Sequence, residues 1–282
     1  MKKHQHHTSV VQRQRDNRRT RRMATRVLPF VASLFLATPL AGPLLRSVAH
    51  STPAPVHATA VVASPLARLD ATMRQTYDHL GAEQQGLRFE VFQKALTGYL
   101  NLRQTGRLDA SQHHLTVIDF DLPSTEKRLW VLDLDKNEVV FHTLVAHGHN
   151  SGENEATNFS NTDQSNMSSL GFYVTGHEYE GKHGHSLRLQ GLDAGFNTNA
   201  ATRSVVMHGA DYVSEEFIKQ NGRLGRSLGC PALPLDQYAQ IIDTVKGGSC
   251  LFLNKSNAGY TSRYLNPDIA IAALATSGLH IS

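Results

Sequence analysis

The sequence predicts a mainly β protein, sandwich-like or barrel-like, with helices at its N-terminal end and a few short helices elsewhere. Two observations lead to this fold class. From Leu115 onward, short apolar segments recur with the two-residue period of strands, and Gly-, Asn- and Ser-rich turns separate them. Before that point, apolar residues repeat every three or four positions, which is typical of amphipathic helices.

The first 60 residues are interpreted as a basic leader followed by an apolar export signal or an uncleaved membrane anchor. Residues 1–26 hold nine Lys or Arg and one Asp, a net charge of +8, whereas the whole chain carries +4. Residues 27–45 are uncharged, and Ala58-Thr59-Ala60 offers a cleavage pattern further on. The positive-inside rule then places the remaining chain outside the cytoplasm. Because the basic charge belongs to the leader, no nucleic-acid partner is expected.

A linker and a helical extension are predicted next. Residues 46–65 are rich in Ala, Pro, Ser and Thr and have no helical or strand period, which is typical of a linker. Apolar stripes at helical spacing predict a helical N-terminal extension over residues 66–110, with helices at 66–80 and 87–102. The β-rich domain is expected over 111–256. A C-terminal tail, 257–282, contains an apolar run at 269–274 that predicts a short docking helix.

Within the β-rich domain, strands and one longer helix are expected in a definite order. A polar stretch at 147–169 is predicted to be a long loop that forms a wall of a substrate cleft. The helix is expected at 235–246, with Leu235, Tyr238, Ala239, Ile242 and Val245 facing inward. The strands are expected at 115–120, 128–133, 139–145, 171–174, 187–189, 203–207 and 250–253.

The stretch Met207–Pro231 carries the residues best suited to chemistry. His208-Gly209 ends an apolar strand, and a Gly- and Arg-rich loop leads to Ser227-Leu228-Gly229-Cys230. Thiolate is the reactive form of cysteine, and a neighbouring imidazole can generate it, through an ion pair. We therefore predict that Cys230 is a nucleophile and that His208 is its base.

The glycines and the serine of this stretch receive supporting roles. Gly209 leaves its carbonyl unshielded, so that the carbonyl can orient the His208 ring. Ser227 is expected to form hydrogen bonds within the loop. Backbone N–H groups of Leu228, Gly229 and Cys230 are predicted to bind a developing oxyanion.

Two alternatives compete with a thiol nucleophile. Cys230 and Cys250 are the only cysteines, and an even number in an exported protein also fits a disulfide, which would leave an inactive wall-binding module. The sixteen histidines raise a metal alternative. No H-E-x-x-H spacing occurs, so neither a metal nor another cofactor is predicted. The best candidate ligands are His147, His149, His183 and His185, with His177 and Asp211 nearby in the sequence.

His208-Gly209 followed by Ser227-Leu228-Gly229-Cys230 resembles the signature of YkuD-type L,D-transpeptidases. The ending Arg226-Ser227-Leu228-Gly229-Cys230-Pro231 is closer to the murein L,D-transpeptidase branch with Arg-Ser-x-Gly-Cys-Pro. The likeness runs from about Leu87 to Leu253. Two departures stand out: Leu228 replaces the common His, and Ala232 replaces a frequent Arg. Arg226 or Arg223 would then supply the missing cation.

The resemblance implies an exported cysteine transpeptidase of the bacterial periplasm or cell envelope, which cross-links peptidoglycan through a thioester. Its partners would be donor and acceptor stem peptides. Ser169 and Gly171 would shape the donor site, and Tyr173, Tyr212 and Arg226 would add substrate contacts. With water as acceptor, the same Cys–His pair would make an L,D-carboxypeptidase or amidase. The sequence leaves both acceptors open, together with a 3-3 or 1-3 position of the link.

Overall fold

The computed structural model describes residues 63–256 and 259–276, all within one compact unit, Thr59–Ser282. The predicted leader and most of the predicted linker lie outside the described residues, as do 257–258 and the last six residues of the predicted tail. Among the residues described, none of the helices combines the length and the apolar character that crossing a membrane requires.

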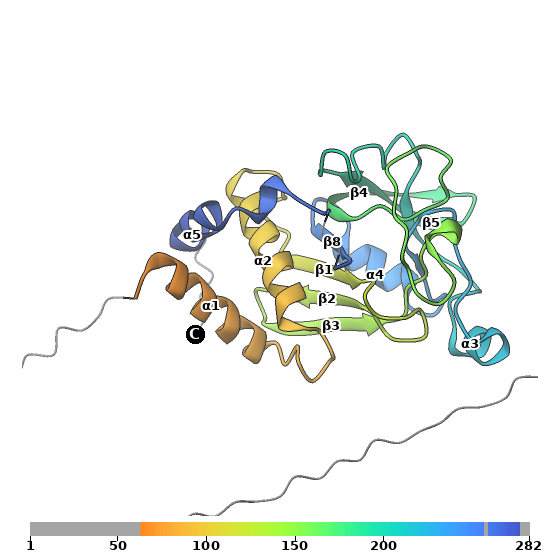
Figure 1. Cartoon of the computed structure of the whole chain (residues 1–282), viewed down its shortest axis with the longest axis horizontal. Coiled ribbons are helices and arrows are strands. Elements are labelled where there is room, and N and C mark those ends of the chain that lie inside the picture. Colours follow the sequence, from red (N-terminus) through yellow and green to blue (C-terminus); the bar gives the residue numbers. More distant parts are fainter. Residues whose placement is uncertain (1–62, 257–258, 277–282) are drawn as a thin grey trace, which may run out of the picture. The chain divides into compact units, whose positions relative to one another are not determined.

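A mixed eight-stranded sheet forms the centre of the domain (Figure 1). Its strand order is β3-β2-β1-β8-β4-β5-β6-β7. Two pairs, β1 with β8 and β6 with β7, are parallel, and the other pairs are antiparallel. The strands are β1 (His114–Asp119), β2 (Leu129–Asp133), β3 (Glu138–Thr143), β4 (Gly171–Gly181), β5 (Gly184–Gly191), β6 (Val206–Gly209), β7 (Ala232–Leu233) and β8 (Cys250–Asn254).

The two edges of this sheet meet. The chain beyond β3 forms a bridge between Ala146 and Ala232 of β7, and a second bridge joins Gly148 to Ser227. The sheet therefore nearly closes into a barrel, which leaves little free edge. The prediction of a mainly β, barrel-like fold is confirmed.

The central strands are buried on both faces because their side chains alternate between two cores. In β1, Val117 faces a core shared with the long helices, whereas Ile118 faces a second core on the other side. In β8, Phe252 faces the first core and Leu251 faces the second. The two-residue period of a strand produces this alternation. It explains why these strands appear as continuous apolar runs.

Three helices cover the first core: α1 (Pro65–His79), α2 (Phe89–Gln104) and α5 (Pro267–Thr276) (Figure 1). The predicted helices at 66–80, 87–102 and 269–274 are therefore confirmed. Ser64 caps α1 by accepting a hydrogen bond of 3.2 Å from the Ala67 N–H, and Pro65 follows as a first helical residue. The remaining elements are η1 (His149–Ser151), α3 (Glu215–Asn221), α4 (Tyr238–Val245) and η2 (Arg263–Leu265), of which α4 packs on the second core.

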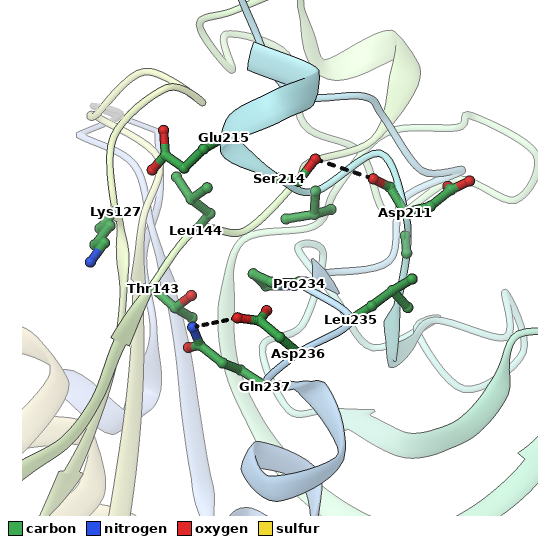
Figure 2. A pocket seen from close by; sticks show the side chains of 12 residues that line it. Lys127, Thr143, Leu144, Asp211, Ser214, Glu215, Pro234, Leu235, Asp236 and Gln237 are labelled. Carbon is green, nitrogen blue, oxygen red and sulfur yellow. Dashed lines mark hydrogen bonds between the residues drawn. The ribbon is translucent and has the colours of Figure 1, made fainter. Parts of the chain in front are cut away.

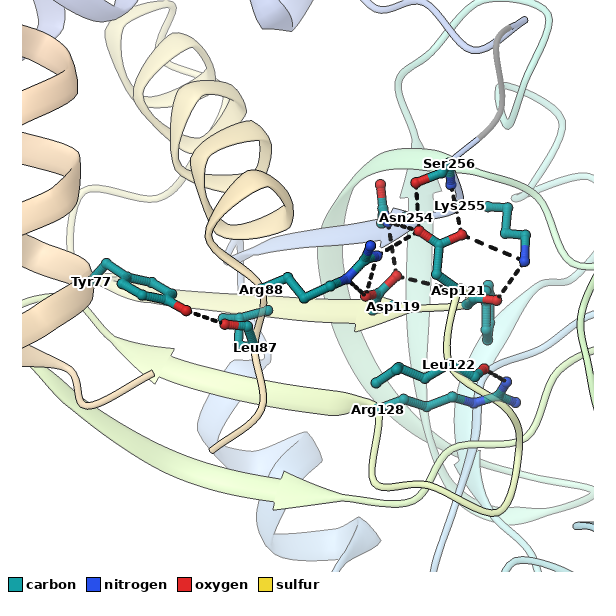
Figure 3. Close-up of polar contacts among 11 residues, drawn as sticks. Tyr77, Leu87, Arg88, Asp119, Asp121, Leu122, Arg128, Asn254, Lys255 and Ser256 are labelled. Atoms are coloured by element: carbon teal, nitrogen blue, oxygen red, sulfur yellow. Dashed lines mark hydrogen bonds and ion pairs between the residues drawn. The ribbon is translucent and has the colours of Figure 1, made fainter. Parts of the chain in front are cut away.

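A polar network ties the start of α2 to the ends of β1 and β8 (Figure 3). Arg88 forms salt bridges of 2.7 Å with Asp119 and 2.5 Å with Asp121. Asn254 donates a hydrogen bond to Asp119, and the Ser256 hydroxyl donates one to Asp121. Burial raises the pKa of Asp121, but hydrogen bonds from Ser256 and Arg88 outweigh burial and lower that pKa to about 2. The network thus fixes the helical extension on the sheet.

Several predicted boundaries differ from the structure. The β4–β5 hairpin extends beyond the predicted 171–174 and 187–189, because its outer half carries polar residues that do not show a strand pattern. Strand β6 starts at Val206 rather than 203, since Ser204 has a positive φ of 54°. The prediction that Leu235 faces inward is wrong. Pro234 starts a turn before α4, and Leu235 is 55% exposed on it.

Candidate active site

Ser227 closes a tight turn that presents Cys230. The Ser227 hydroxyl accepts a hydrogen bond of 3.0 Å from the Gly229 N–H and donates one of 2.6 Å to the Cys230 carbonyl. Gly229 has a φ of +124°, and a Cβ there would lie 2.8 Å from the Met167 carbonyl oxygen, so only glycine fits. The sequence therefore needs both Ser227 and Gly229 to form this turn.

The turn leaves two backbone donors available. The Gly229 N–H, one of the three predicted oxyanion donors, is bound to the Ser227 hydroxyl in this structure. The N–H groups of Leu228 and Cys230 donate to no residue in the described part of the chain. Both N–H groups are therefore available as hydrogen-bond donors at this turn.

The Cys230 thiol rests against the backbone that precedes and begins β6. The Val206 N–H donates to Sγ at 3.4 Å, and the thiol donates to the Ser204 carbonyl at 3.8 Å. Burial raises the pKa of Cys230, whereas the Val206 N–H and the Arg203 charge lower it, and the net shift is upward. Cys250 is fully buried in β8, and both cysteines are free. The disulfide considered from the cysteine count is not formed.

His208 lies on β6. The neighbouring strand, β7, follows Cys230 in the chain. His208 pairs with Ala232 of β7, two residues after Cys230. Its Nδ1 lies 2.9 Å from the Gly209 carbonyl oxygen. A carbonyl only accepts hydrogen bonds, so Nδ1 carries the proton and Nε2 keeps a free lone pair. In this geometry Nε2 is the ring nitrogen of His208 that can accept a proton.

The carbonyl that orients His208 is itself held in place. A Cβ at Gly209 would lie 2.7 to 2.8 Å from atoms of the Tyr238 ring, so this side chain of α4 packs directly on the glycine.

Burial lowers the pKa of His208, the bond to the Gly209 carbonyl opposes that shift, and the charge of His183 adds to it. Burial raises the pKa of Cys230 as well, and both shifts favour the uncharged forms, thiol and neutral imidazole, over the ion pair expected from the sequence.

The predicted loop at 147–169 contacts the Cys230 turn. The Ser168 hydroxyl accepts a hydrogen bond of 3.0 Å from the Gly148 N–H and donates one of 3.4 Å to the Gly229 carbonyl. Arg203 holds the same loop, donating to the carbonyls of Ser160 at 2.8 Å and Met167 at 2.7 Å. Arg203 is also the cation whose charge acts on the thiol. Sequence reasoning missed Arg203, because nothing in its local pattern distinguishes it from other arginines.

Ser169 and Gly171, predicted to shape the donor site, and Tyr173, a predicted substrate contact, are buried at the end of this loop and just after it. The Ser169 hydroxyl donates to the Ser160 carbonyl at 2.7 Å, and the Tyr173 hydroxyl donates to the Ser169 carbonyl at 2.8 Å. Both side chains are 1% exposed. A Cβ at Gly171 would lie 2.3 Å from a carboxylate oxygen of Asp193. In this structure these residues support the loop through buried contacts.

The remaining predicted residues lie nearer the surface. Arg226 donates to the Gly152 carbonyl at 3.1 Å and to Glu153 at 2.8 Å, and Arg223 lies 2.9 Å from the same carboxylate. Tyr212 is half-buried, and burial, followed by the electrostatic effects of Cys230 and Asp211, raises its pKa to about 12. Leu228 is 72% exposed at the turn.

Comparison with known proteins identifies the family. Residues 83–254, more than half of the chain, match the family model described as L,D-transpeptidase catalytic domain. The chain belongs to this family. The matched range includes the thiol, the imidazole and the loop around them. A search of the curated proteins found no match.

Solved structures similar to this L,D-transpeptidase domain are distant in sequence. An L,D-transpeptidase from Mycobacterium smegmatis is 15% identical, with 51% of this chain and 59% of that chain covered and a TM-score of 0.33. The helical cell shape determining protein Pgp2 from Campylobacter jejuni, a mutant form, is 11% identical, with 64% and 63% covered and a TM-score of 0.35. An L,D-transpeptidase from Xylanimonas cellulosilytica is 14% identical, with 66% and 93% covered and a TM-score of 0.30. The chain spans less than two thirds of the length of the first two.

The L,D-transpeptidase domain also has an open cavity of about 510 Å³ beyond the ends of β6 and β7 (Figure 2). Neither Cys230 nor His208 lines it. Its walls combine the residues after β6, including Asp211 and Glu215, with the turn that holds Leu235. Among the described residues, no three His, Cys, Asp or Glu side chains are grouped so that they could hold a metal ion.

Proposed function

We propose that this protein is an exported cysteine L,D-transpeptidase that cross-links peptidoglycan stem peptides through a thioester. One observation carries the proposal: the bond of 2.9 Å from His208 Nδ1 to the Gly209 carbonyl, which leaves Nε2 unprotonated on the strand next to the Cys230 turn. Membership of the L,D-transpeptidase catalytic domain family supports the substrate class, since that family acts on peptidoglycan.

In the first step, Cys230 leaves the Ser204 carbonyl and its thiol proton passes to Nε2 of His208. The thiolate then attacks the carbonyl carbon of the third residue of a donor stem, at its L-centre. The N–H groups of Leu228 and Cys230, free in the resting structure, bind the oxyanion that forms. Removal of one such donor typically lowers kcat by about 10²–10³-fold.

In the second step, the tetrahedral intermediate expels the terminal D-alanine, whose nitrogen takes the proton from His208. The thioester at Cys230 is then attacked by an amine of an acceptor stem. His208 takes a proton from that amine, and the thiolate leaves as the new peptide bond forms. The thiolate finally regains its proton from His208, so the enzyme returns to its resting neutral pair.

The proposal places the enzyme in the periplasm or cell envelope, where its substrate lies. The basic and apolar leader of residues 1–60 would direct export and would remain as a membrane anchor if it is not cleaved. Fractionation of cells that express the full chain, with N-terminal sequencing of the mature protein, tests both points. A full-length protein found in the cytoplasmic fraction contradicts export.

The activity is tested with purified tetrapeptide muropeptides and mass spectrometry, with the Cys230→Ala variant alongside. We expect a dimer that has lost one alanine, absent with the variant, and fragmentation of the dimer locates the bond. Trimmed monomers without dimers would show instead that water is the acceptor. No product from either protein, with Cys230 still reactive toward a thiol reagent, would reject the proposed substrate.

A further inference from the structure

His183 lies directly on the imidazole of His208. It occupies the two-residue loop between β4 and β5, next to the Gly181–Gly184 pair that ends the hairpin. The two rings are stacked, with centroids 4.4 Å apart and planes inclined by 24°. The stack follows from the sheet register, because Ser186 of β5 pairs with His208 and brings the hairpin end beside β6.

The stack separates His208 from solvent. His208 is 2% exposed, whereas His183 is exposed. The hairpin that carries His183 is tied to the end of α4, because Lys246 lies 2.9 Å from Glu178 of β4. The hairpin that carries the covering ring is therefore attached to the end of α4.

We propose that His183 is a positioning residue for the reaction of Cys230: its ring covers one face of the His208 imidazole and fixes the plane in which Nε2 meets the thiol. The proposal rests on the function proposed above and adds a residue to it. The bond to Gly209 restrains one edge of the ring, and the stack restrains rotation about that bond. Neither contact alone defines the direction of Nε2.

The contact also sets the charge that His208 can carry. The charge of His183 lowers the pKa of His208, in addition to the larger effect of burial. The stacked ring of His183 presents its π face to the imidazolium that forms when Cys230 gives up its proton. The lowered pKa of His208, to which burial and His183 both contribute, agrees with this arrangement. The same hairpin, α4 and the Cys230 turn carry other titratable groups: Glu180, Lys182, His185, Tyr238, Asp243 and Cys230.

The test measures alkylation of Cys230 by iodoacetamide in the purified full chain, as a function of pH and by mass spectrometry. This readout needs no stem peptide, and Cys250 is fully buried. Three variants are compared: His183→Ala removes the ring, His183→Phe keeps a flat ring without charge, and Lys182→Ala alters the exposed neighbour in the same loop.

With His183→Ala, we expect the rate near neutral pH to fall at least about ten-fold, part of the roughly 10²–10⁴-fold that a positioned base contributes. The acid limb of the profile should also move upward, toward the ordinary histidine pKa, because His208 becomes hydrated and loses its charged neighbour. His183→Phe should keep a rate within about three-fold of wild type, and Lys182→Ala should match wild type, as surface changes usually do.

An unchanged rate and acid limb in His183→Ala would overturn the proposal, as would a loss in His183→Phe as large as that in the alanine variant. The proposed function can fail separately. If wild type shows the expected alkylation profile and the variants shift it, yet no muropeptide product forms, then the role of His183 stands and the substrate assignment is wrong.

Discussion

The guanidinium of Arg128 donates a hydrogen bond of 2.8 Å from Nη2 to Nδ1 of His147, and both side chains are fully buried. Arginine has no lone pair to accept a hydrogen bond, so His147 must accept at Nδ1 and carry its proton on Nε2. Nε2 lies 3.3 Å from the Gly152 carbonyl oxygen. The pair therefore anchors the start of the loop that reaches the Cys230 turn.

Replacing Arg128 should destabilise the fold strongly. Its guanidinium donates to the Val145 carbonyl at 2.9 and 3.1 Å and to the Leu122 carbonyl at 2.8 Å, so Arg128→Met leaves several buried acceptors unpaired. We expect the free energy of unfolding to fall by about 3 kcal/mol or more, measured by urea denaturation. Lys127→Met, at the exposed neighbouring position, is the control and should change it by less than about 0.5 kcal/mol. Equal effects of the two variants would contradict this account.

His147 should make stability depend on pH in a definite window. Burial and the Arg128 charge lower its pKa from 6.5 to about 4 in the folded protein. The unfolded chain therefore binds more protons between these pH values, so the contribution of neutral His147 is complete above pH 6.5 and is lost as the pH falls toward 4. The loss amounts to about 3 kcal/mol at most. Urea denaturation from pH 7 to 4 should show a shallower pH slope for His147→Gln than for wild type; identical slopes would exclude His147 as the source.

Ser227→Ala should reduce activity more than stability. The variant loses the hydroxyl that closes the Cys230 turn and frees the Gly229 N–H, so Sγ and the oxyanion donors lose their fixed positions. We expect kcat/KM to fall about ten- to a hundred-fold with about 1 kcal/mol of lost stability. Ser214→Ala, which removes the cap of α3, should cost a similar stability without the loss of activity. If kcat/KM falls equally in both variants, Ser227 affects activity only through the stability of the fold.

Arg203 should be the cation that assists the thiol. Its charge lowers the pKa of Cys230, whereas Arg223 is paired with Glu153. Arg203→Gln should therefore move the alkaline limb of Cys230 alkylation to higher pH, because the thiolate loses a favourable charge. Arg223→Gln, the matched control, should leave that limb in place. A shifted limb in Arg223→Gln together with an unchanged limb in Arg203→Gln would contradict this prediction.

Local sequence patterns predicted the secondary structure correctly where the burial of a single helix or strand determines the pattern. Helical stripes predicted α1 and α2, and alternation predicted most strands, because burial of Val117 and Phe252 follows from the two-residue period itself. Leu235 was misplaced because an apolar residue at helical spacing looks the same whether the helix includes it or a turn precedes it. The outer half of the β4–β5 hairpin was missed because it projects from the core with polar residues on it.

By itself, the sequence determined the strand and helix content and the candidate pair Cys230 and His208, since these depend on short-range periodicity and on residue chemistry. Only the tertiary structure decided which groups surround that pair. Arg203 and His183 reach the site from other elements, and their contacts depend on strand register and loop packing. The preference of Cys230 and His208 for their uncharged forms also depends on the tertiary structure. Burial raises the pKa of the thiol and lowers that of the imidazole, and burial exists only in the folded chain.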